Sequence, residues 1–290
     1  MSTALLGIDH TIVGVRDLEA GRAAWTRLGF TATPRGSHIG WGTANYCIMF
    51  EADYIELLGI VDPTQFTNRL DEFLDDREGL IGLAFGAGDV DAFAAGLKKL
   101  GVGFDGPNDL KRNLELDEGT VQPAFRLVFP VAEAVPGLSA FACQHLTPEL
   151  VRRPGWLKHP NGAAAIRSVT VVAERPADYV EAYERLLGAG SCVMTDDMLT
   201  VHTGGALILF TPADLLETLH PMAAADPAIK APYPAAMTLA VADPEATAAS
   251  LKGNGVPFDR QADGSVAVAA EYATGVWLEF AAIEAAPPTA

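Results

Sequence analysis

This sequence of 290 residues lacks long apolar runs, an N-terminal targeting pattern and more than a few cysteines. Its three cysteines, Cys47, Cys143 and Cys192, are odd in number and far apart, which predicts buried thiols in a reducing compartment. No apolar stretch reaches the roughly 18 residues of a membrane span. The first residues have no basic segment like that of a signal peptide. We therefore expect a cytoplasmic protein without a membrane partner.

Positive charge is also scarce. The chain has 20 Lys and Arg against 37 Asp and Glu, and its formal net charge is −17. Such a surface repels phosphate backbones, so nucleic acid is not an expected partner. The sequence has no glycine-rich phosphate loop, no nucleophile elbow and no CxxC pair, which leaves nucleotide-binding and hydrolase functions without support. The expected partner is a small-molecule substrate, and a homodimer is left open.

What the sequence does contain is a pattern that occurs four times. A helix-like segment that ends near a glycine recurs at 16–29, 88–102, 176–188 and 243–256. Aspartates near the beginning suit a helix N-cap, and the glycines suit the position just beyond a helix. Each segment follows a strand-like run and precedes two or three more, with a period of about 70–80 residues. The pattern predicts an α+β fold made of four βαβββ modules.

The modules should combine in pairs, because a single one would leave one face of its sheet bare. The length suits two domains of ordinary size, and a hydrophobic fraction of 49% allows a core in each. We therefore predict domains at 1–150 and 164–284, joined by a linker at 151–163. Residues 285–290 are expected to form a flexible tail.

Two ionisable residues of the first module lie among apolar residues. His10 is part of the strand-like run 8–15, and Glu56 is part of the run 54–58. An unpaired buried carboxylate is costly, and a metal ion or a cationic partner relieves that cost. Imidazole and carboxylate are common ligands of divalent cations. The simpler alternative is a strand histidine that bonds to the backbone, and Glu279 shows the Glu56 pattern without a histidine.

The repeated module and several short stretches resemble the vicinal oxygen chelate superfamily, which includes glyoxalase I, extradiol dioxygenases and bleomycin-resistance proteins. The most specific stretches are 8–10, 28–30, 38–45, 54–58 and 143–150. Together they are similar to the subgroup of glyoxalase-like domain proteins. This resemblance implies two paired glyoxalase-like domains whose sheets curl around a metal cleft. It also implies that ligands lie on the first and last strands of each module.

Carried over residue by residue, the resemblance implies metal ligands at His10 and Glu56. In the second module the first-strand position is Gly82, which offers no ligand, and the last-strand position is Gln144 or His145. With His145, the set would contain two histidines and one carboxylate and would suit a divalent cation such as Fe, Mn, Ni or Zn.

The C-terminal half keeps little of this chemistry. Its corresponding positions include Ser168 and Ala236 on first strands, and Glu279 is the one carboxylate on a last strand. We therefore expect 164–284 to be a ligand-poor domain and place any active cleft in 1–150.

Three further residues are catalytic candidates. His38 and Asn45 flank 40–43 and could line the cleft, as an acid or base and as an amide that positions a substrate, although such residues are also typical of turns. Arg126 lies in an apolar run, where it could bind a carboxylate or enediolate oxygen or face solvent. The remaining histidines are expected at the surface: His159, His202 and His220.

Two functions follow from the resemblance. The first is a metal-dependent enzyme of the glyoxalase/dioxygenase type that acts on a small oxygenated substrate. Lyase or isomerase chemistry is slightly preferred, and dioxygenase chemistry comes next. The alternative is a metal-free small-molecule-binding protein of the bleomycin-resistance type, which would use the same cleft without a cation.

Overall fold

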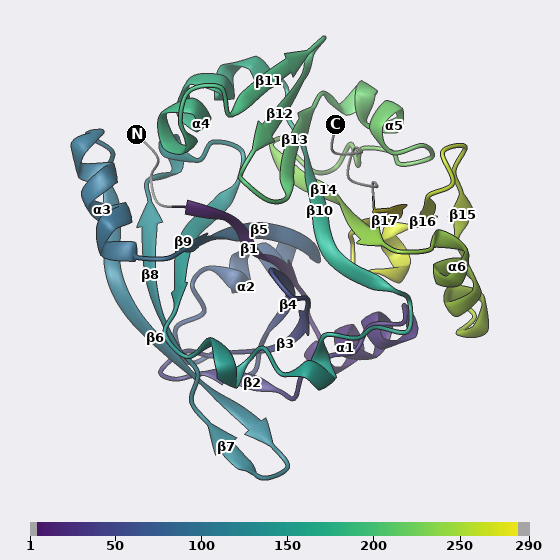
Figure 1. Ribbon diagram of the computed structural model, residues 1–290, viewed down its shortest axis with the longest axis horizontal. Coiled ribbons are helices and arrows are strands. Elements are labelled where there is room, and N and C mark those ends of the chain that lie inside the picture. Colours follow the sequence, from purple (N-terminus) through teal and green to yellow (C-terminus); the bar gives the residue numbers. More distant parts are fainter. Residues whose placement is uncertain (1–4, 284–290) are drawn as a thin grey trace, which may run out of the picture.

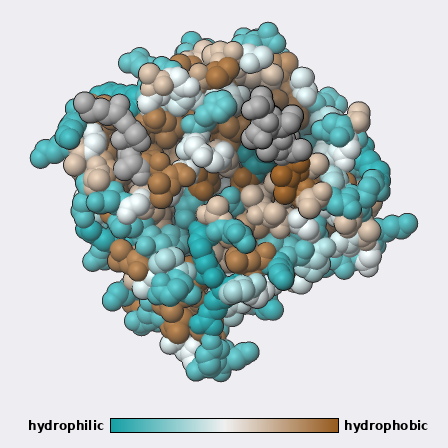
Figure 2. All heavy atoms as spheres, viewed as in Figure 1, coloured by the Kyte–Doolittle hydropathy of each residue, from teal (hydrophilic) through white to brown (hydrophobic). Residues whose placement is uncertain are grey.

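The computed structural model, which describes residues 5–283, contains two β-sheets (Figure 1). A nine-stranded sheet is built from 5–145, and an eight-stranded sheet from 163–282. Within the described residues, no helix has both the length and the hydrophobicity needed to cross a bilayer. The predicted tail at 285–290 lies outside these residues. In the space-filling view, hydrophilic side chains form most of the rim of the molecule, and hydrophobic ones lie between them (Figure 2).

The first sheet closes into a barrel. Its strand order is β2-β3-β4-β1-β5-β9-β8-β6-β7, and an additional β2–β6 pairing joins eight strands into a ring from which β7 extends. The strands are β1 (Leu5–Gly14), β2 (Gly36–His38), β3 (Thr43–Met49), β4 (Tyr54–Ile60), β5 (Gly79–Ala87), β6 (Phe104–Leu116), β7 (Gly119–Val121), β8 (Ala124–Pro130) and β9 (Ser139–His145). The interior of a barrel with about 8 strands can hold one small ligand.

The second sheet stays open, with the order β11-β12-β13-β10-β14-β17-β16-β15. Its strands are β10 (Ala163–Val172), β11 (Cys192–Thr195), β12 (Met198–His202), β13 (Leu207–Thr211), β14 (Tyr233–Val241), β15 (Asp259–Arg260), β16 (Val266–Val268) and β17 (Trp277–Ala282). Among the described residues no pairing joins β11 to β15, so this sheet has two edges where the barrel has a closed ring.

One helix follows the first strand of each module. These helices are α1 (Leu18–Arg27), α3 (Val90–Lys99), α4 (Val180–Leu187) and α6 (Pro244–Gly253). Two shorter helices, α2 (Leu70–Asp76) and α5 (Leu216–Leu219), lie in the connections between paired modules. The order of elements confirms the predicted α+β fold of four βαβββ modules.

The helix boundaries follow from local chemistry. Asp17 caps α1 by accepting hydrogen bonds from the backbone N–H groups of Glu19 and Ala20. Asp89 caps α3 in the same way, and Asp243 caps α6 by accepting from the N–H of Glu245. After α1 the chain reverses at Gly29, where φ is +87° and a residue with a Cβ would be strained. The aspartate and glycine signals in the sequence therefore marked real helix ends.

The two sheets share a continuous hydrophobic core. Trp25 of α1 is fully buried, and its Nε1 donates a hydrogen bond to Thr274 Oγ1 at 2.9 Å. The rings of Phe30 and Phe280 stack with centroids 6.0 Å apart. Asp53, in the β3–β4 turn, accepts a hydrogen bond from the N–H of Ile166 in β10 at 3.1 Å. The halves are therefore packed against each other.

His159 lies in this junction, and its predicted position at the surface is wrong. It is buried, its Nδ1 accepts from the Thr31 N–H at 3.0 Å, and its Nε2 donates to the Met49 carbonyl at 3.0 Å. Burial lowers the pKa of this imidazole, so the neutral tautomer with one donor and one acceptor fits both partners. The predicted linker segment thus contributes to the packing between the sheets.

Candidate active site

The barrel encloses a cavity of about 530 Å³, a size typical of small-molecule sites. Its lining combines apolar and aromatic side chains with polar ones. The first group includes Trp41, Tyr54, Leu110, Phe125, Phe129 and Phe141. The second includes His10, His38, Thr43, Asn45, Glu56 and Arg112. Residues of α2 also line the cavity, so a helix lies at its edge.

His10 and Glu56 meet on neighbouring strands of the barrel. Strands β1 and β4 run parallel, and Glu56 pairs with Ile12, two positions beyond His10. His10 Nε2 lies 3.6 Å from Glu56 Oε2, and both residues are buried. His10 Nδ1 lies 2.7 Å from Asp9 Oδ2. A carboxylate that holds one ring nitrogen and leaves the other directed at the site is the usual support of a metal-binding histidine.

His38 and Asn45 extend this group around Glu56. His38 Nδ1 lies 2.8 Å from Thr43 Oγ1, and its Nε2 is 3.8 Å from Glu56 Oε1. The amide nitrogen of Asn45 donates to the same Glu56 oxygen at 2.5 Å. The cavity therefore brings together four residues that the sequence analysis selected, and two imidazoles present Nε2 to one carboxylate.

Gly36 makes room for this arrangement. It pairs with Asn45 between β2 and β3, and a Cβ at Gly36 would lie 2.2 Å from Asn45 Oδ1 and 3.2 Å from Arg112 Cδ. Any larger residue would push these two side chains away from the cavity lining. The glycine is therefore required by close approach and not by its backbone conformation.

The electrostatics of the site leave a carboxylate beside a neutral imidazole. Burial acts to raise the pKa of Glu56, but the neighbouring His10 and His38 and the Asn45 amide outweigh it, so the pKa lies below its ordinary value. Burial is also the main cause that lowers the pKa of His38, to about 4. At neutral pH Glu56 is therefore ionised, and His38 is uncharged and able to accept a proton or bind a cation.

Arg112 is a cavity residue that the sequence analysis missed. It lies on β6, where it pairs with His38 of the neighbouring strand β2, and it is only 3% exposed. Its Nη1 donates to Cys47 Sγ at 3.1 Å, and its Nε has no hydrogen-bond partner among the described residues. A usable signal was present, because strand alternation places Arg112 on the same face as Leu110 and Leu114.

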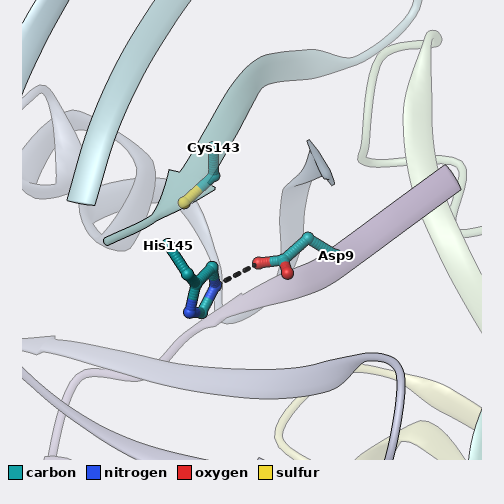
Figure 3. A group of neighbouring side chains, drawn as sticks. All are labelled: Asp9, Cys143 and His145. Atoms are coloured by element: carbon teal, nitrogen blue, oxygen red, sulfur yellow. Dashed lines mark hydrogen bonds and ion pairs between the residues drawn. The ribbon is translucent and has the colours of Figure 1, made fainter. Parts of the chain in front are cut away.

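His145 lies outside this cavity, on the far side of Asp9. It lines a second cavity of about 260 Å³. Its Nε2 is 3.0 Å from Asp9 Oδ2, and Figure 3 draws this contact as a dashed line. The Asp9 carboxylate is therefore shared by His145 and His10, and their hydrogen bonds hold its pKa below the ordinary value although burial opposes them. The predicted set of His10, Glu56 and His145 does not converge on one point.

Asp9, Cys143 and His145 form a separate group that could hold a metal ion. Within the described part of the chain they are the one set of three or more His, Cys, Asp and Glu residues whose ligand atoms all lie within 4.8 Å of one another. Arg152 Nη2 also lies 3.5 Å from Asp9 Oδ1. The group already satisfies Asp9 as an ion-pair network, so a cation would have to displace these partners.

In the second module, the position that corresponds to Glu56 is occupied by neither Gln144 nor His145. Ile12 pairs with Glu56, and in the second module Ala84, 72 positions after Ile12, pairs with Phe141. Phe141 thus holds the position that matches Glu56, and it lines the cavity. Gln144 instead accepts from the Val90 N–H at 3.2 Å at the beginning of α3. The second module therefore supplies an aromatic ring where the first supplies a carboxylate.

Arg126 is placed away from the cavity lining. It lies on β8, and its guanidinium forms ion pairs with Asp91 at 2.5 Å and with Asp109 at 3.2 Å. Asp91 belongs to α3, which packs against the barrel. These contacts fit a strand–helix ion pair.

The second sheet contains a buried counterpart of Glu56. Glu279 on β17 pairs with Thr238 on β14, in the register that Glu56 has with Ile12. His220 Nδ1 lies 2.7 Å from Glu279 Oε2, and Ser265 Oγ donates to Oε1 at 2.9 Å. His220 is 2% exposed, so its predicted surface position is wrong. Each oxygen of the Glu279 carboxylate therefore has a close partner within the protein.

Comparison with known proteins matches residues 8–187 to the family model described as a glyoxalase-like domain. No curated protein matches the sequence. Among solved structures, a hypothetical protein from Staphylococcus aureus is similar with a TM-score of 0.69 and 14% identity, covering 95% of this chain and 99% of that one.

Two further solved structures are similar over almost the whole chain. A mutant of 4-hydroxymandelate synthase from Streptomyces coelicolor has a TM-score of 0.60 and 14% identity, covering 98% of this chain and 94% of that one. A fusion protein of a xylose isomerase-like TIM barrel and 4-hydroxyphenylpyruvate dioxygenase also has a TM-score of 0.60 and 14% identity. This chain is covered completely and spans 50% of that protein. At these identities the likeness establishes the fold.

Proposed function

The chain belongs to the glyoxalase-like domain family, within the vicinal oxygen chelate superfamily, and on that premise we propose that it is a metal-dependent enzyme. The barrel cavity would bind a small oxygenated substrate, and a divalent cation would lie between His10 and Glu56. The observation that carries the proposal is the arrangement of His10 and His38, which are both held through Nδ1 and both direct Nε2 at the Glu56 carboxylate.

The donor atoms fit a cation at His10 and Glu56. Ligand bonds to zinc and similar ions are about 2.0–2.2 Å long, so two ligand atoms of one ion lie roughly 3–3.6 Å apart. The distance from His10 Nε2 to Glu56 Oε2 is 3.6 Å. His38 Nε2 lies 3.8 Å from Glu56 Oε1, but His10, His38 and Glu56 do not all lie within 4.8 Å of one another, so His38 is not placed among the ligands. His145 contributes indirectly, by holding Asp9 against His10.

The residues of the chain have distinct tasks in this proposal. Asn45 fixes one oxygen of Glu56, which leaves the other directed at His10. His38 is neutral at physiological pH and can take up or return a proton near the substrate. The aromatic lining limits the access of water, which strengthens electrostatic interactions inside the cavity. A bound divalent cation would supply Lewis-acid stabilisation of negative charge on substrate oxygens.

Lyase or isomerase chemistry remains slightly preferred over dioxygenase chemistry. A neutral imidazole beside an ionised carboxylate suits proton transfer next to a polarised carbonyl. The cation would be Fe, Mn, Ni or Zn, and its identity would choose between these reactions, because redox-active metals favour oxygen chemistry. A cytoplasmic site of action and a homodimer stay predictions.

A second candidate is a metal-free small-molecule-binding protein of the bleomycin-resistance type. It is favoured by the second module, where Gly82 and Phe141 occupy the positions that match ligand positions of the first. The cavity then has potential metal ligands on one module only. In this alternative, His10, His38 and Glu56 would form a polar network for ligand binding.

Metal content tests the proposal. The protein is purified without chelator and analysed by elemental mass spectrometry, alongside His10→Ala and Glu56→Gln. Glu279→Gln is the matched control, because Glu279 has the same register position in the second sheet. We expect a near-stoichiometric divalent metal that both cavity variants lose and the control retains.

Three results would contradict this expectation. Metal that persists in both cavity variants but disappears in Cys143→Ser would assign the ion to the group of Asp9, Cys143 and His145. Metal that all four variants retain would place the ion in neither group. Absence of metal, with no thermal stabilisation by added divalent ions, would favour the metal-free binding protein. Circular dichroism of each variant confirms that the fold is retained.

A further inference from the structure

Arg112 is a buried guanidinium without a carboxylate partner among the described residues. It is 3% exposed. Its described contacts are the Cys47 thiol at 3.1 Å and the ring of Phe125, whose centroid lies 5.6 Å from the guanidinium carbon. A thiol is a weak acceptor and a ring face carries no net charge. The positive charge is therefore buried without a counter-ion at contact distance, which is an expensive state.

Other arginines of the chain show that carboxylates are not in short supply. Arg126 forms ion pairs with Asp91 and Asp109, and Arg153 forms one with Glu118 at 2.6 Å. These pairs lie near the surface, where an ion pair contributes little. The chain has 37 Asp and Glu, yet none forms an ion pair with Arg112 in the described part of the chain. An anion from outside the chain would supply the missing partner.

The surroundings of Arg112 indicate the shape of that anion. Arg112 lines the barrel cavity together with Phe125, Phe129 and Phe141, and on the neighbouring strand it pairs with His38. The cation therefore lies beside both the aromatic lining and the polar group around Glu56. The volume of about 530 Å³ is enough for a ring-sized body with one charged group.

We infer that Arg112 binds the carboxylate of the substrate, and that the substrate is a small organic acid with an apolar, ring-sized body. The planar guanidinium suits a carboxylate because it offers parallel N–H donors. With the carboxylate at Arg112, the rest of the molecule lies along the phenylalanines and reaches the group around His10 and Glu56. This inference rests on the proposed function, since it assumes that the cavity is where substrate binds.

Binding of two probes to the wild-type protein gives the first test. Phenylacetate and phenylacetamide have the same ring and nearly the same shape, but only phenylacetate is an anion. Titration calorimetry is done with chelator-treated protein, so the result does not depend on a bound metal. We expect phenylacetate to bind at least about tenfold more tightly, because charge-assisted hydrogen bonds are about twice as strong as neutral ones. Acetate, without the ring, should bind more weakly than phenylacetate.

Variants then assign the preference to Arg112. Arg112→Gln should remove the advantage of phenylacetate over phenylacetamide and leave phenylacetamide binding nearly unchanged. Arg112→Lys should restore part of it, because it keeps the charge and loses the planar fork. Arg153→Gln is the control for a general change in charge, since Arg153 pairs with exposed Glu118. Far-ultraviolet circular dichroism and urea unfolding check that each variant is folded.

The inference is overturned if the wild-type protein binds both probes equally or binds neither at millimolar concentration. It is also overturned if a folded Arg112→Gln keeps the full preference for phenylacetate. The comparison of probes needs no variant, so it remains decisive if Arg112→Gln does not fold. Metal content is a separate readout. A wild-type protein that holds metal but shows no preference for phenylacetate removes this inference alone, and one that prefers phenylacetate but holds no metal removes the metal proposal alone.

Discussion

Glu56 and Glu279 hold the same register position in the two halves of the molecule, and their surroundings differ. Glu56 faces a cavity of about 530 Å³, where two imidazoles approach it at 3.6 and 3.8 Å. Glu279 is bonded to His220 at 2.7 Å and to Ser265 at 2.9 Å. The fold thus provides a carboxylate on a last strand, and the neighbouring segments decide whether it can meet a ligand.

The connection between paired modules makes much of this difference. In the barrel, the β4–β5 connection contains α2, which lines the cavity without bonding to Glu56. In the second sheet, the β13–β14 connection contains α5, and the next residue, His220, reaches Glu279. His220 also bonds to Thr170 at 2.8 Å. In the second sheet, His220 therefore fills the space beside Glu279, whereas in the barrel the space beside Glu56 is part of the cavity.

The largest expected effect is the difference in stability between two single variants, Glu279→Ala and Glu56→Ala. Glu279→Ala should lower the free energy of unfolding by about 3–5 kcal/mol, because it leaves His220 and Ser265 without their partner in a closed core. Glu56→Ala should cost much less or even stabilise the protein, because functional sites often hold charges at the expense of stability. Urea unfolding of both variants measures the difference. Equal losses would show that the two carboxylates play the same structural role.

A third buried carboxylate, Asp53, extends the comparison to the junction of the halves. Burial raises its pKa to about 7, although the N–H of Ile166 opposes this. Between about pH 4 and pH 7, the folded state therefore holds a proton that the unfolded state has lost. The contribution of Asp53 to stability is present at low pH and is lost as the pH rises toward 7.

Asp53→Asn should remove this slope, because an amide oxygen still accepts from Ile166 and does not ionise. Relative to the wild type, the free energy of unfolding of the variant should rise by roughly 1 kcal/mol for each pH unit between about 4 and 7. Urea unfolding at several pH values measures the gain, and Asp75→Asn, at an exposed position of α2, is the control. A difference that does not change with pH would contradict the expectation.

The parts of the structure that the sequence predicted depend on local signals. Helix ends follow from caps such as Asp17 and from glycines such as Gly29, which act within a few residues. His10 and Glu56 could be selected because each is an ionisable residue inside an apolar run. The βαβββ order follows from these elements, and pairing of modules follows from the need to cover each sheet.

The parts that the sequence did not predict depend on contacts between distant segments. Alternation along the strand puts Arg112 on one face with Leu110 and Leu114, but this face is buried in the cavity because β6 pairs with β2 and closes the barrel. His220 reaches Glu279 from 59 residues away, and Asp9 reaches His145 across 136. Phe141 was not predicted at the position that corresponds to Glu56, because the sequence of one strand does not reveal its register with the neighbouring strand.

The smallest expected effect concerns the neutral side chain that orients each carboxylate. Ser265 donates one hydrogen bond to the Glu279 carboxylate, so Ser265→Ala should lower the free energy of unfolding by about 1.5–3 kcal/mol, the usual contribution of a hydrogen bond to a charged group. Asn45 donates to Glu56, but its own oxygen has no described partner. Asn45→Ala should therefore cost less stability and instead weaken metal or ligand binding in the cavity. Unfolding and binding titrations on both variants measure the two quantities. If Ser265→Ala weakened binding as much as Asn45→Ala does, the second sheet would also contribute to the site. Glu56 and Glu279 would then not differ in their access to a ligand.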